Sequence, residues 1–299
     1  MAGIERTLDV SVVAGRCAVD WGLAPDSLSV GSGGMNSQTW LVRAAADRYV
    51  AKAVPSDRRG TFEAGLRVAT IVEAAGIPAG APIRTVDGEI VLDVDGFALA
   101  VLRFVEGSEL TGREPSEQAL IGTTLGRVHH ALLGHDLPGA APFPWLDPTA
   151  HHVSIRPWIR PAIEAALAEW DALVPDSLTW APLHTDPAPE AFRLDAATGV
   201  CGLIDWDLGV VGPLLYDLAS AQMYVGGPEH GDPLIAAYLA TGALSRDEVA
   251  RGLPTLARLR WAIQADYFAQ RIATDDLTGI ADPAENEEGL EDARRALLG

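Results

Sequence analysis

The hydrophobic pattern of this chain changes at about residue 110, and that change limits the folds it can adopt. Before it, short apolar runs are separated by glycine turns, as in "LSVGSGGMNSQTWLVRA" (28–44) and around the "VDG" turns at 86–88 and 94–96. Such runs predict antiparallel strands. In this part of the chain, only residues 9–21 and 61–75 have helical spacing.

Beyond residue 115 the apolar residues recur at helical spacing, with one interruption. Residues 182–206 read as loop, strand, turn and strand, which predicts a hairpin embedded among helices. A β-rich first part and a helical second part indicate an α+β protein with two lobes, and ligands favour the cleft between lobes. The predicted helices cover residues 116–133, 157–173, 213–225, 231–241 and 246–273.

Charge and composition argue against several classes of partner. The net charge of −19 argues against a nucleic acid, because phosphate binding needs a basic face, and it favours a cationic ligand. The chain has no run of 18 apolar residues, so no membrane-spanning helix is predicted. The segment "MAGIERTLDV" lacks the pattern of a signal peptide. The two cysteines, far apart, do not indicate a disulfide framework. These features predict a cytoplasmic protein with no membrane partner.

Lys52, in the strand-like run "RYVAKAV" (48–54), is the only lysine among the 22 lysine and arginine residues. A strand lysine after a glycine turn can direct its ammonium at nucleotide phosphates, while N–H groups of the turn cover them. Both features have ordinary alternatives. The run "GSGGMNS" (31–37) is also typical of a plain hairpin turn, and most strand lysines simply extend to water.

Two carboxylates end apolar runs on either side of the predicted hairpin. They are Asp186 in "LHTD" (183–186) and Asp205 in "LIDWD" (203–207). Phosphoryl transfer requires a carboxylate that accepts the proton of the attacking hydroxyl, and an oxygen ligand for Mg²⁺. Acids at the ends of buried strands are less ordinary than loop acids, because an unpaired buried charge is costly. The pair therefore favours phosphoryl transfer.

Taken together, "HTDPAP", "LIDWD" and "GPLLYDLA" make the chain resemble the aminoglycoside phosphotransferase and choline kinase family, small-molecule kinases built on the protein-kinase fold. The resemblance extends over nearly the whole chain, from "GGMNSQTWLV" and "YVAK" to "YDLASAQ". It implies a bilobal, protein-kinase-like α+β fold. The β-rich N-terminal lobe, residues 1–104, would bind the nucleotide. The mostly helical C-terminal lobe, residues 105–299, would carry catalysis and bind the acceptor.

The resemblance also implies roles for individual residues. In this family the acid of the "HTD" motif is the catalytic base, here Asp186, and the acid of "IDW", here Asp205, coordinates magnesium. The strand lysine, here Lys52, holds the α- and β-phosphates. An acid on the following helix pairs with that lysine, and Glu63 is the first candidate, with Glu73 as the alternative.

Other nucleotide contacts follow from the same resemblance. The segment "VLRFVEG" (101–107) is similar to the hinge of this family, whose backbone near Arg103 and Val105 would bind the purine edge of ATP or GTP. Asp217 in "YDLA" resembles an acid that braces the catalytic loop, and His184 is expected to order that loop. The phosphates would be covered by Gly33, Gly34, Asn36 and Ser37 of the glycine turn.

The chain departs from the family at one position. The family has an asparagine five residues after the catalytic acid as a second metal ligand, whereas this chain has Ala191 there. Asp207 and Glu190 are the candidate substitutes, although Asp207 is equally well read as a solvated loop acid. Mg²⁺ needs only one or two carboxylates besides phosphates and water, so the loss is compatible with activity.

The predicted activity is ATP- or GTP-dependent transfer of a phosphoryl group to a hydroxyl of a small molecule, with Mg²⁺. An antibiotic is the first expectation for the acceptor, in resistance or self-resistance, and a sugar or amino alcohol is the second. Asp266, Asp275 and Asp276 could line the acceptor pocket, although residues 260–279 are also typical of a core helix, and Glu190 is expected to face solvent or substrate. The alternative, favoured by Ala191, is a pseudokinase that binds ligands without turnover.

Overall fold

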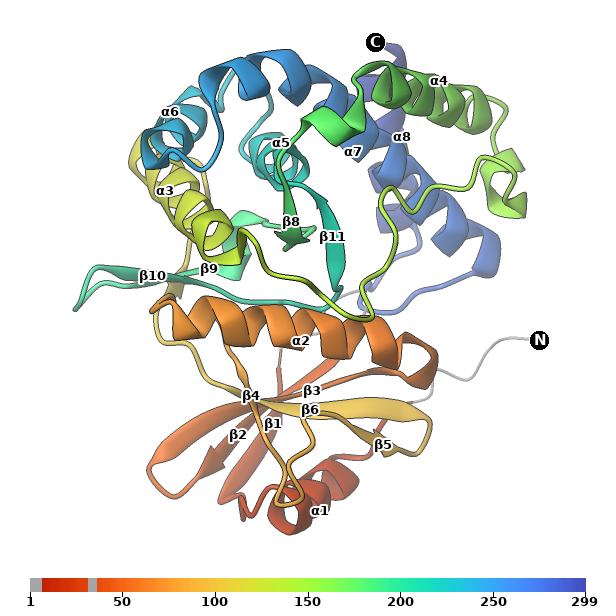
Figure 1. Cartoon of the computed structure of the whole chain (residues 1–299). Helices are drawn as coiled ribbons and strands as arrows, with labels where there is room; N and C mark the ends of the chain where they lie inside the picture. Colours follow the sequence, from red (N-terminus) through yellow and green to blue (C-terminus); the bar gives the residue numbers. More distant parts are fainter. Residues whose placement is uncertain (1–6, 32–36) are drawn as a thin grey trace.

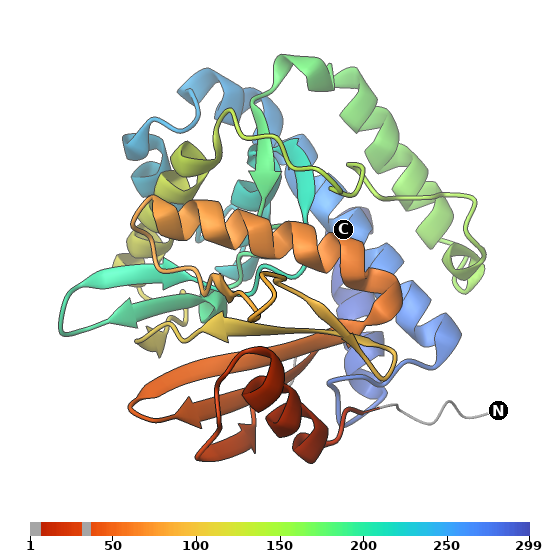
Figure 2. The same cartoon turned by 60° about the horizontal axis from the view of Figure 1, so that its bottom comes forward.

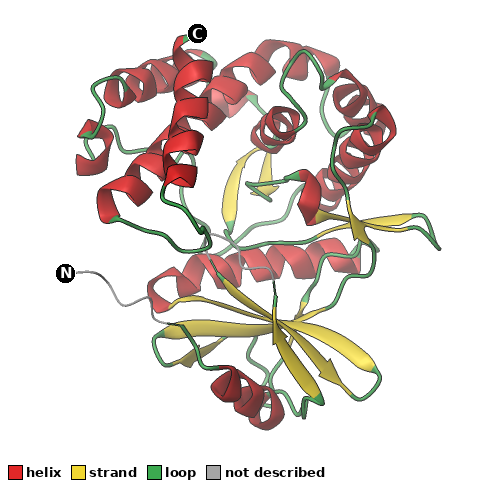
Figure 3. Cartoon of the chain, turned by 180° about the vertical axis from the view of Figure 1, so that it is seen from behind, coloured by secondary structure: helices red, strands yellow, loops and turns green. Residues whose placement is uncertain are grey.

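In the computed structural model of the chain, which describes residues 7–31 and 37–299, strands gather in one lobe and most helices in the other (Figures 1 and 3). The strands are β1 (Ser27–Val30), β2 (Gln38–Ala44), β3 (Asp47–Pro55), β4 (Pro82–Ile83), β5 (Leu92–Val94), β6 (Phe97–Arg103), β7 (Ser108–Glu109), β8 (Trp180–Leu183), β9 (Phe192–Asp195), β10 (Val200–Leu203) and β11 (Val210–Pro213). The helices are α1 (Val10–Asp20), α2 (Arg59–Ala74), α3 (Pro115–Leu132), α4 (Ile159–Ala172), α5 (Leu215–Tyr224), α6 (Asp232–Thr241), α7 (Arg246–Thr274) and α8 (Ala284–Leu298).

The first lobe is an antiparallel sheet in the order β1-β2-β3-β6-β4, with β5 also paired to β6. Strand β3 lies at its centre, where Lys52 is in register with Thr39 of β2 and Ala100 of β6. Successive residues of a strand point to opposite faces. Ala51 and Ala53 therefore join the core under α1, whereas Lys52 and Val54 face the side that α2 covers.

Helix α2 lies between the two lobes, across the sheet (Figure 2). Phe62 and Leu66 pack on the sheet, and Val68 and Val72 belong to the core of the second lobe. At Gly65 the helix comes very close to the loop after β10, since a Cβ there would be 2.4 Å from the carbonyl oxygen of Trp206. Only glycine allows this approach, which fixes the rotation of α2 against that loop.

The second lobe is a helical body that holds two small sheets. The chain leaves the first sheet at Arg103, and β7 pairs with β9 in the order β10-β9-β7, so residues 104–107 connect the lobes. Strands β8 and β11 form the other sheet. The hairpin of β9 and β10 extends from the body beside α2 (Figure 1). Strands β8 and β10 end just before the two predicted acidic motifs, which places both motifs on loops between the lobes.

The two-lobed α+β organisation agrees with the periodicity of the sequence, and the predicted helices appear within a few residues of their expected bounds. Strands β7, β8 and β11 and helix α8 were not predicted. Helix α8 is rich in charged residues and buries a narrow stripe that includes Leu290, Ala293 and Leu297, so its apolar signal is weak. Strand β11 forms by pairing with β8, a contact between distant segments that the local sequence does not reveal. Within the described part of the chain, no helix is both long and apolar enough to cross a membrane.

Candidate active site

The lysine of β3 lies between two carboxylates of the loop that follows β10. Lys52 Nζ is 2.9 Å from Asp205 Oδ1 and 2.6 Å from Asp207 Oδ1. The Lys52 side chain is 6% exposed and that of Asp205 is 58% exposed, so the group opens to solvent on the Asp205 side. A cation from the first lobe and two acids from the second therefore meet between the lobes.

The shape of the loop brings the two carboxylates together. Asp205 has a left-handed φ of 72°, and the Asp207 N–H donates to the Asp205 carbonyl oxygen at 3.0 Å, which closes a three-residue turn. Trp206, between them, is buried, and its indole N–H donates to the Leu203 carbonyl oxygen at 2.8 Å. The turn leaves both acids on one side and the indole on the other.

The ammonium of Lys52 favours the charged form of both carboxylates, whereas burial, with a contribution from the charge of Asp205, raises the pKa of Asp207. Burial opposes the charge of Lys52, but the carboxylates of Asp207 and Asp205 outweigh it and raise the pKa of the ammonium. The ammonium of Lys52 in turn lowers the pKa of Asp205. At neutral pH the lysine is therefore protonated and Asp205 ionised.

The family resemblance implies a magnesium ion, and the carboxylates of Asp205 and Asp207 fit one. Mg²⁺ prefers oxygen ligands, and it commonly takes only one or two carboxylates beside water and nucleotide phosphates. Over residues 7–31 and 37–299, no group of three or more His, Cys, Asp or Glu side chains is arranged to hold a metal. Asp205 and Asp207 are the two carboxylates that would hold such an ion.

Replacing Asp207 tests whether it compensates for Ala191, which is buried and offers only a methyl group. We expect Asp207→Ala to raise the Mg²⁺ concentration for half-maximal activity roughly 10-fold, the effect of losing one hydrogen-bonding or ionic contact to a charged group. Ala191→Asn in the same chain should recover part of the loss, because an amide oxygen is a suitable Mg²⁺ ligand. Asp171→Ala, on the exposed side of α4, is the control. An unchanged Mg²⁺ dependence in Asp207→Ala would remove Asp207 from the metal site.

The predicted pairing of Lys52 with an acid of α2 is wrong. Glu63 binds Arg67 at 2.7 Å, and Glu73 binds Arg103 at 3.0 Å. The rotation of α2 explains this: Gly65 faces the loop of Asp205, and Glu63, two residues away, points about 200° around the helix. Asp205 and Asp207 supply the negative charge that Glu63 was expected to supply.

The predicted nucleotide contacts lie partly outside the described residues. Gly33, Gly34 and Asn36 fall in residues 32–36, which the structure does not describe. Ser37 is described and is buried. At the predicted hinge, the Arg103 N–H donates to the Ala81 carbonyl oxygen at 3.0 Å. The backbone of Val105 has no hydrogen-bond partner among the described residues, so its N–H and carbonyl groups are free to bind a ligand.

The loop that carries Asp186 is held from below by Asp217 of α5. Asp217 is fully buried and accepts hydrogen bonds from the N–H groups of His184 at 2.7 Å and Thr185 at 2.8 Å. Thr185 has a left-handed φ of 75°, which these bonds support. His129 of α3 lies 3.2 Å from the same carboxylate. Asp217 thus has the bracing role that was predicted for it.

His184 connects the loops of the two predicted acids. Its Nε2–H donates to the Ile204 carbonyl oxygen at 2.7 Å, and its ring packs edge-on against Trp206. Its Nδ1 accepts a hydrogen bond from the backbone N–H of Asp186 at 3.4 Å. The imidazole is therefore occupied in holding the loops together, as expected for an ordering residue.

Asp186 lies exposed on this loop, and two residues that were not predicted contact its carboxylate. Its side chain is 61% exposed, and its Oδ1 accepts hydrogen bonds from the hydroxyl of Tyr224 and from Arg260 Nη2, the latter at 3.2 Å. No other described residue hydrogen-bonds this carboxylate, so Oδ2 is open. The sequence carried a weak signal for Arg260, a basic residue at an otherwise apolar position of a predicted helix.

The acids expected to line an acceptor pocket are not gathered around Asp186. Asp266 is 2.7 Å from His152 and lies about 120° around α7 from Arg260. Asp276 binds Arg271 at 3.3 Å beyond the end of α7, and Asp275 is exposed there. Glu190 is exposed on the turn that follows Asp186.

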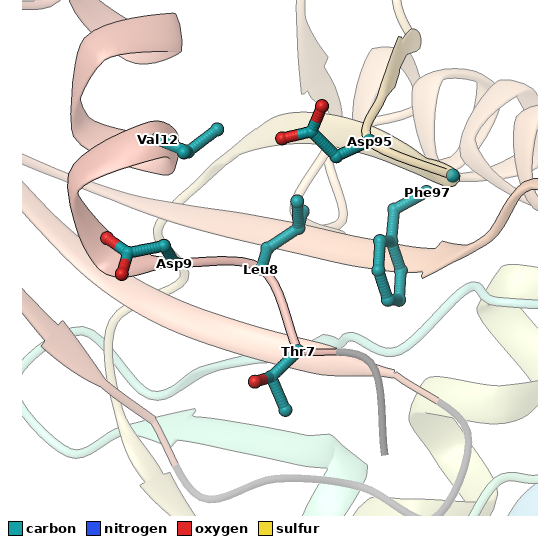
Figure 4. A pocket seen from close by; sticks show the side chains of 7 residues that line it. Thr7, Leu8, Asp9, Val12, Asp95 and Phe97 are labelled. Carbon is teal, nitrogen blue, oxygen red and sulfur yellow. The ribbon is translucent and has the colours of Figure 1, made fainter. Parts of the chain in front are cut away.

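An open hollow of about 480 Å³ lies elsewhere, on the α1 side of the first sheet (Figure 4). Lys52 faces the opposite side of that sheet, so the hollow is separate from the candidate active site. Its lining consists of Thr7, Leu8, Asp9, Val12, Asp95, Gly96 and Phe97.

A sheet lobe and a helical lobe, with a strand lysine facing two loop acids and a third acid on a braced loop, are the features of a kinase-like phosphotransferase. The chain belongs to the phosphotransferase enzyme family, whose sequence profile matches residues 27–261. The predicted family resemblance is thereby confirmed.

Individual relatives agree with this assignment. A homoserine kinase from Allorhizobium ampelinum is 27% identical over 203 residues. The matched region covers 62% of this chain and 62% of that protein, which is less than two thirds of its length.

Two solved structures share the fold. The amicoumacin kinase hAmiN, in complex with AMP-PNP, Ca²⁺ and Ami, has a TM-score of 0.73 at 14% identity, covering 97% of this chain and 93% of its own. The choline kinase LicA from Streptococcus pneumoniae has a TM-score of 0.70 at 14% identity, covering 96% and 98%. The predicted kinase-like fold is confirmed.

Proposed function

We propose that this protein transfers the γ-phosphoryl group of ATP or GTP to a hydroxyl of a small molecule. The observation that carries the proposal is the meeting of Lys52 with Asp205 and Asp207 between the lobes, beside the loop of Asp186. A protein that only bound nucleotide would have no need of an exposed carboxylate with one open oxygen next to that place. In this proposal residues 1–104 bind the nucleotide, and residues 105–299 carry catalysis and bind the acceptor.

Each group has a defined task in this reaction. Lys52 binds phosphate oxygens, and the open Oδ2 of Asp186 takes the proton of the acceptor hydroxyl. The hydroxyl oxygen forms a bond to the γ-phosphorus, and the bond from that phosphorus to the β–γ bridging oxygen breaks, which releases the nucleoside diphosphate. Asp205 and Asp207 would hold Mg²⁺, which when bound neutralises phosphate charge.

Two similarities and the net charge bear on the class of acceptor. The fold shared with an amicoumacin kinase supports an antibiotic, and the sequence similarity to a homoserine kinase supports an amino alcohol. The net charge of −19 supports an acceptor with a positive group, and exposed Glu190 is the acid nearest in sequence to Asp186 that could bind it. We place an antibiotic first and a small amino alcohol or sugar second.

Nucleotide consumption by the purified protein with Mg²⁺, measured against aminoglycoside, nucleoside and peptide antibiotics, homoserine, choline and sugars, tests the proposal. We expect consumption with at least one acceptor class, and a phosphorylated product by mass spectrometry. Asp186→Asn protein, which should still bind nucleotide, is the control for background hydrolysis. Tight binding of Mg-nucleotide without turnover on the whole panel would support the pseudokinase alternative that Ala191 suggests.

A further inference from the structure

Tyr224 of α5 and Arg260 of α7 both contact the carboxylate of Asp186, and the transfer reaction as outlined gives them no task. We propose that these two side chains are positioning residues, which hold Oδ1 of Asp186 so that Oδ2 is presented to the acceptor hydroxyl. The proposal rests on the function proposed above, in which Asp186 takes the hydroxyl proton.

Arg260 has a fixed orientation. Its side chain is 9% exposed, its Nε donates to Ser220 Oγ at 3.0 Å, and its Nη1 lies 3.4 Å from Gln264 Oε1. The remaining nitrogen, Nη2, reaches Asp186 at 3.2 Å and the Tyr224 hydroxyl at 3.1 Å. The guanidinium is thus held by α5 and α7, and one end of it is directed at the loop of Asp186.

Arg260 and Asp186 differ in how much each needs the other to compensate its charge. A buried arginine needs a partner for its charge, and among the described residues Asp186 is the only carboxylate within 4.0 Å of it. Asp186 is largely exposed, and water would satisfy its charge without any partner. For fold stability alone, an apolar residue at position 260 would avoid the burial cost. The arrangement therefore serves Asp186 more than it serves the core.

Tyr224 directs its proton at the same oxygen. Although Tyr224 is 37% exposed, partial desolvation, followed by the negative charge of Asp186, raises the pKa of its phenol, which remains protonated and donates to Oδ1. Tyr224 lies one helical turn after Ser220 on α5, so that helix presents both groups to Arg260.

Two donors on one oxygen restrict the rotation of the whole carboxylate. An exposed aspartate without such contacts would populate several staggered side-chain conformations, of which only some bring an oxygen to the acceptor. With Oδ1 held, Oδ2 keeps one direction before the acceptor binds. Loss of such orientation lowers the rate of the chemical step and leaves the affinity for the substrates intact.

Tyr224→Phe is the decisive variant, because it removes one hydroxyl and keeps the ring. With an acceptor that the wild type phosphorylates, we expect kcat to fall by between about 10- and 10²-fold. The KM values for nucleotide and acceptor, the Mg²⁺ dependence and the thermal midpoint should not change. Tyr49→Phe, on the face of β3 opposite Lys52, is the matched control. In an Asp186→Asn background, Tyr224→Phe should cause no further loss, since it acts through that carboxylate.

Arg260 is tested by Arg260→Lys and Arg260→Ala. If both fold, the lysine should retain more kcat than the alanine, because it keeps a donor near Oδ1. A purely structural role predicts instead a fall in thermal midpoint for both, with kcat per folded molecule preserved. Unchanged kcat in Tyr224→Phe, or a full further loss in the Asp186→Asn background, would overturn the proposal.

If the proposed phosphotransfer itself were wrong, the experiments would give a different result from those described for Tyr224 and Arg260. A wild type without turnover on any acceptor would contradict the proposed function and leave Asp186 without a hydroxyl to deprotonate. A crystal structure of Tyr224→Phe would then decide the positional claim by itself. A wild-type side-chain conformation of Asp186 would refute it, and a changed or multiple conformation would support it.

Discussion

Asp186→Asn is expected to lower turnover by about 10²–10⁴-fold, the usual contribution of a positioned proton acceptor. Asparagine has the same shape as aspartate, and its amide oxygen can still accept from Tyr224 and Arg260, so the side chain should stay in place. It cannot take the hydroxyl proton. Nucleotide affinity, measured by calorimetry with Mg²⁺ present, should remain near the wild-type value.

Two accompanying measurements make this result specific. Asp171→Asn, an exposed change on α4, should leave turnover unaffected. The thermal midpoint of Asp186→Asn should fall, because the buried guanidinium of Arg260 loses the only described carboxylate within 4.0 Å, although the amide oxygen keeps its hydrogen bond, so turnover is compared per folded molecule. If nucleotide affinity collapsed while turnover per bound complex survived, Asp186 would belong to the nucleotide site and not to proton transfer.

Lys52→Arg is expected to keep the charge and lose the function. The ammonium fits at 2.9 and 2.6 Å from two carboxylates with 6% of the side chain exposed, and the longer, forked guanidinium cannot occupy that place without moving them. We expect kcat/KM for the nucleotide to fall roughly 10- to 100-fold, since a hydrogen bond to a charged group contributes about 1.5–3 kcal/mol.

Arg43→Lys, the reverse exchange at an exposed position of neighbouring β2, is the matched control and should have wild-type kinetics. Circular dichroism and thermal unfolding of Lys52→Arg establish that the lobes still fold. Wild-type kinetics in Lys52→Arg would mean that any cation serves at this position, and that the survival of a single lysine in the sequence is coincidental.

The local sequence pattern was sufficient for the lobes and for the loops that carry the acids. Alternating and helical spacing are properties of neighbouring residues, so β3 and α2 could be predicted from the sequence. The motifs around Lys52, Asp186 and Asp205 each follow or lie in such an element, which gave their approximate places. The charged helix α8 and the pairing-dependent strand β11 lack a strong local pattern and were not predicted.

The choice of acid that meets Lys52 depended on tertiary structure. The family resemblance favoured Glu63, with Glu73 as the alternative, and Asp207 was considered only as a metal ligand or a solvated loop acid. The choice comes from the close packing of Gly65 on the Trp206 carbonyl, which sets the rotation of α2 and turns Glu63 away. A helix rotation of this kind depends on contacts between lobes, which no short window of sequence contains.

The sequence by itself determined the class of protein, because the lysine, the acids and the strands that bear them are encoded in short contiguous motifs. Only the tertiary structure brought Tyr224 and Arg260 to Asp186, across 38 and 74 residues of chain. The packing of α5 against α7 sets those distances, and in the sequence Arg260 is marked only weakly, as a basic residue at an otherwise apolar position of a predicted helix. The role of its charge becomes apparent only in the folded protein, where the guanidinium contacts the carboxylate of Asp186.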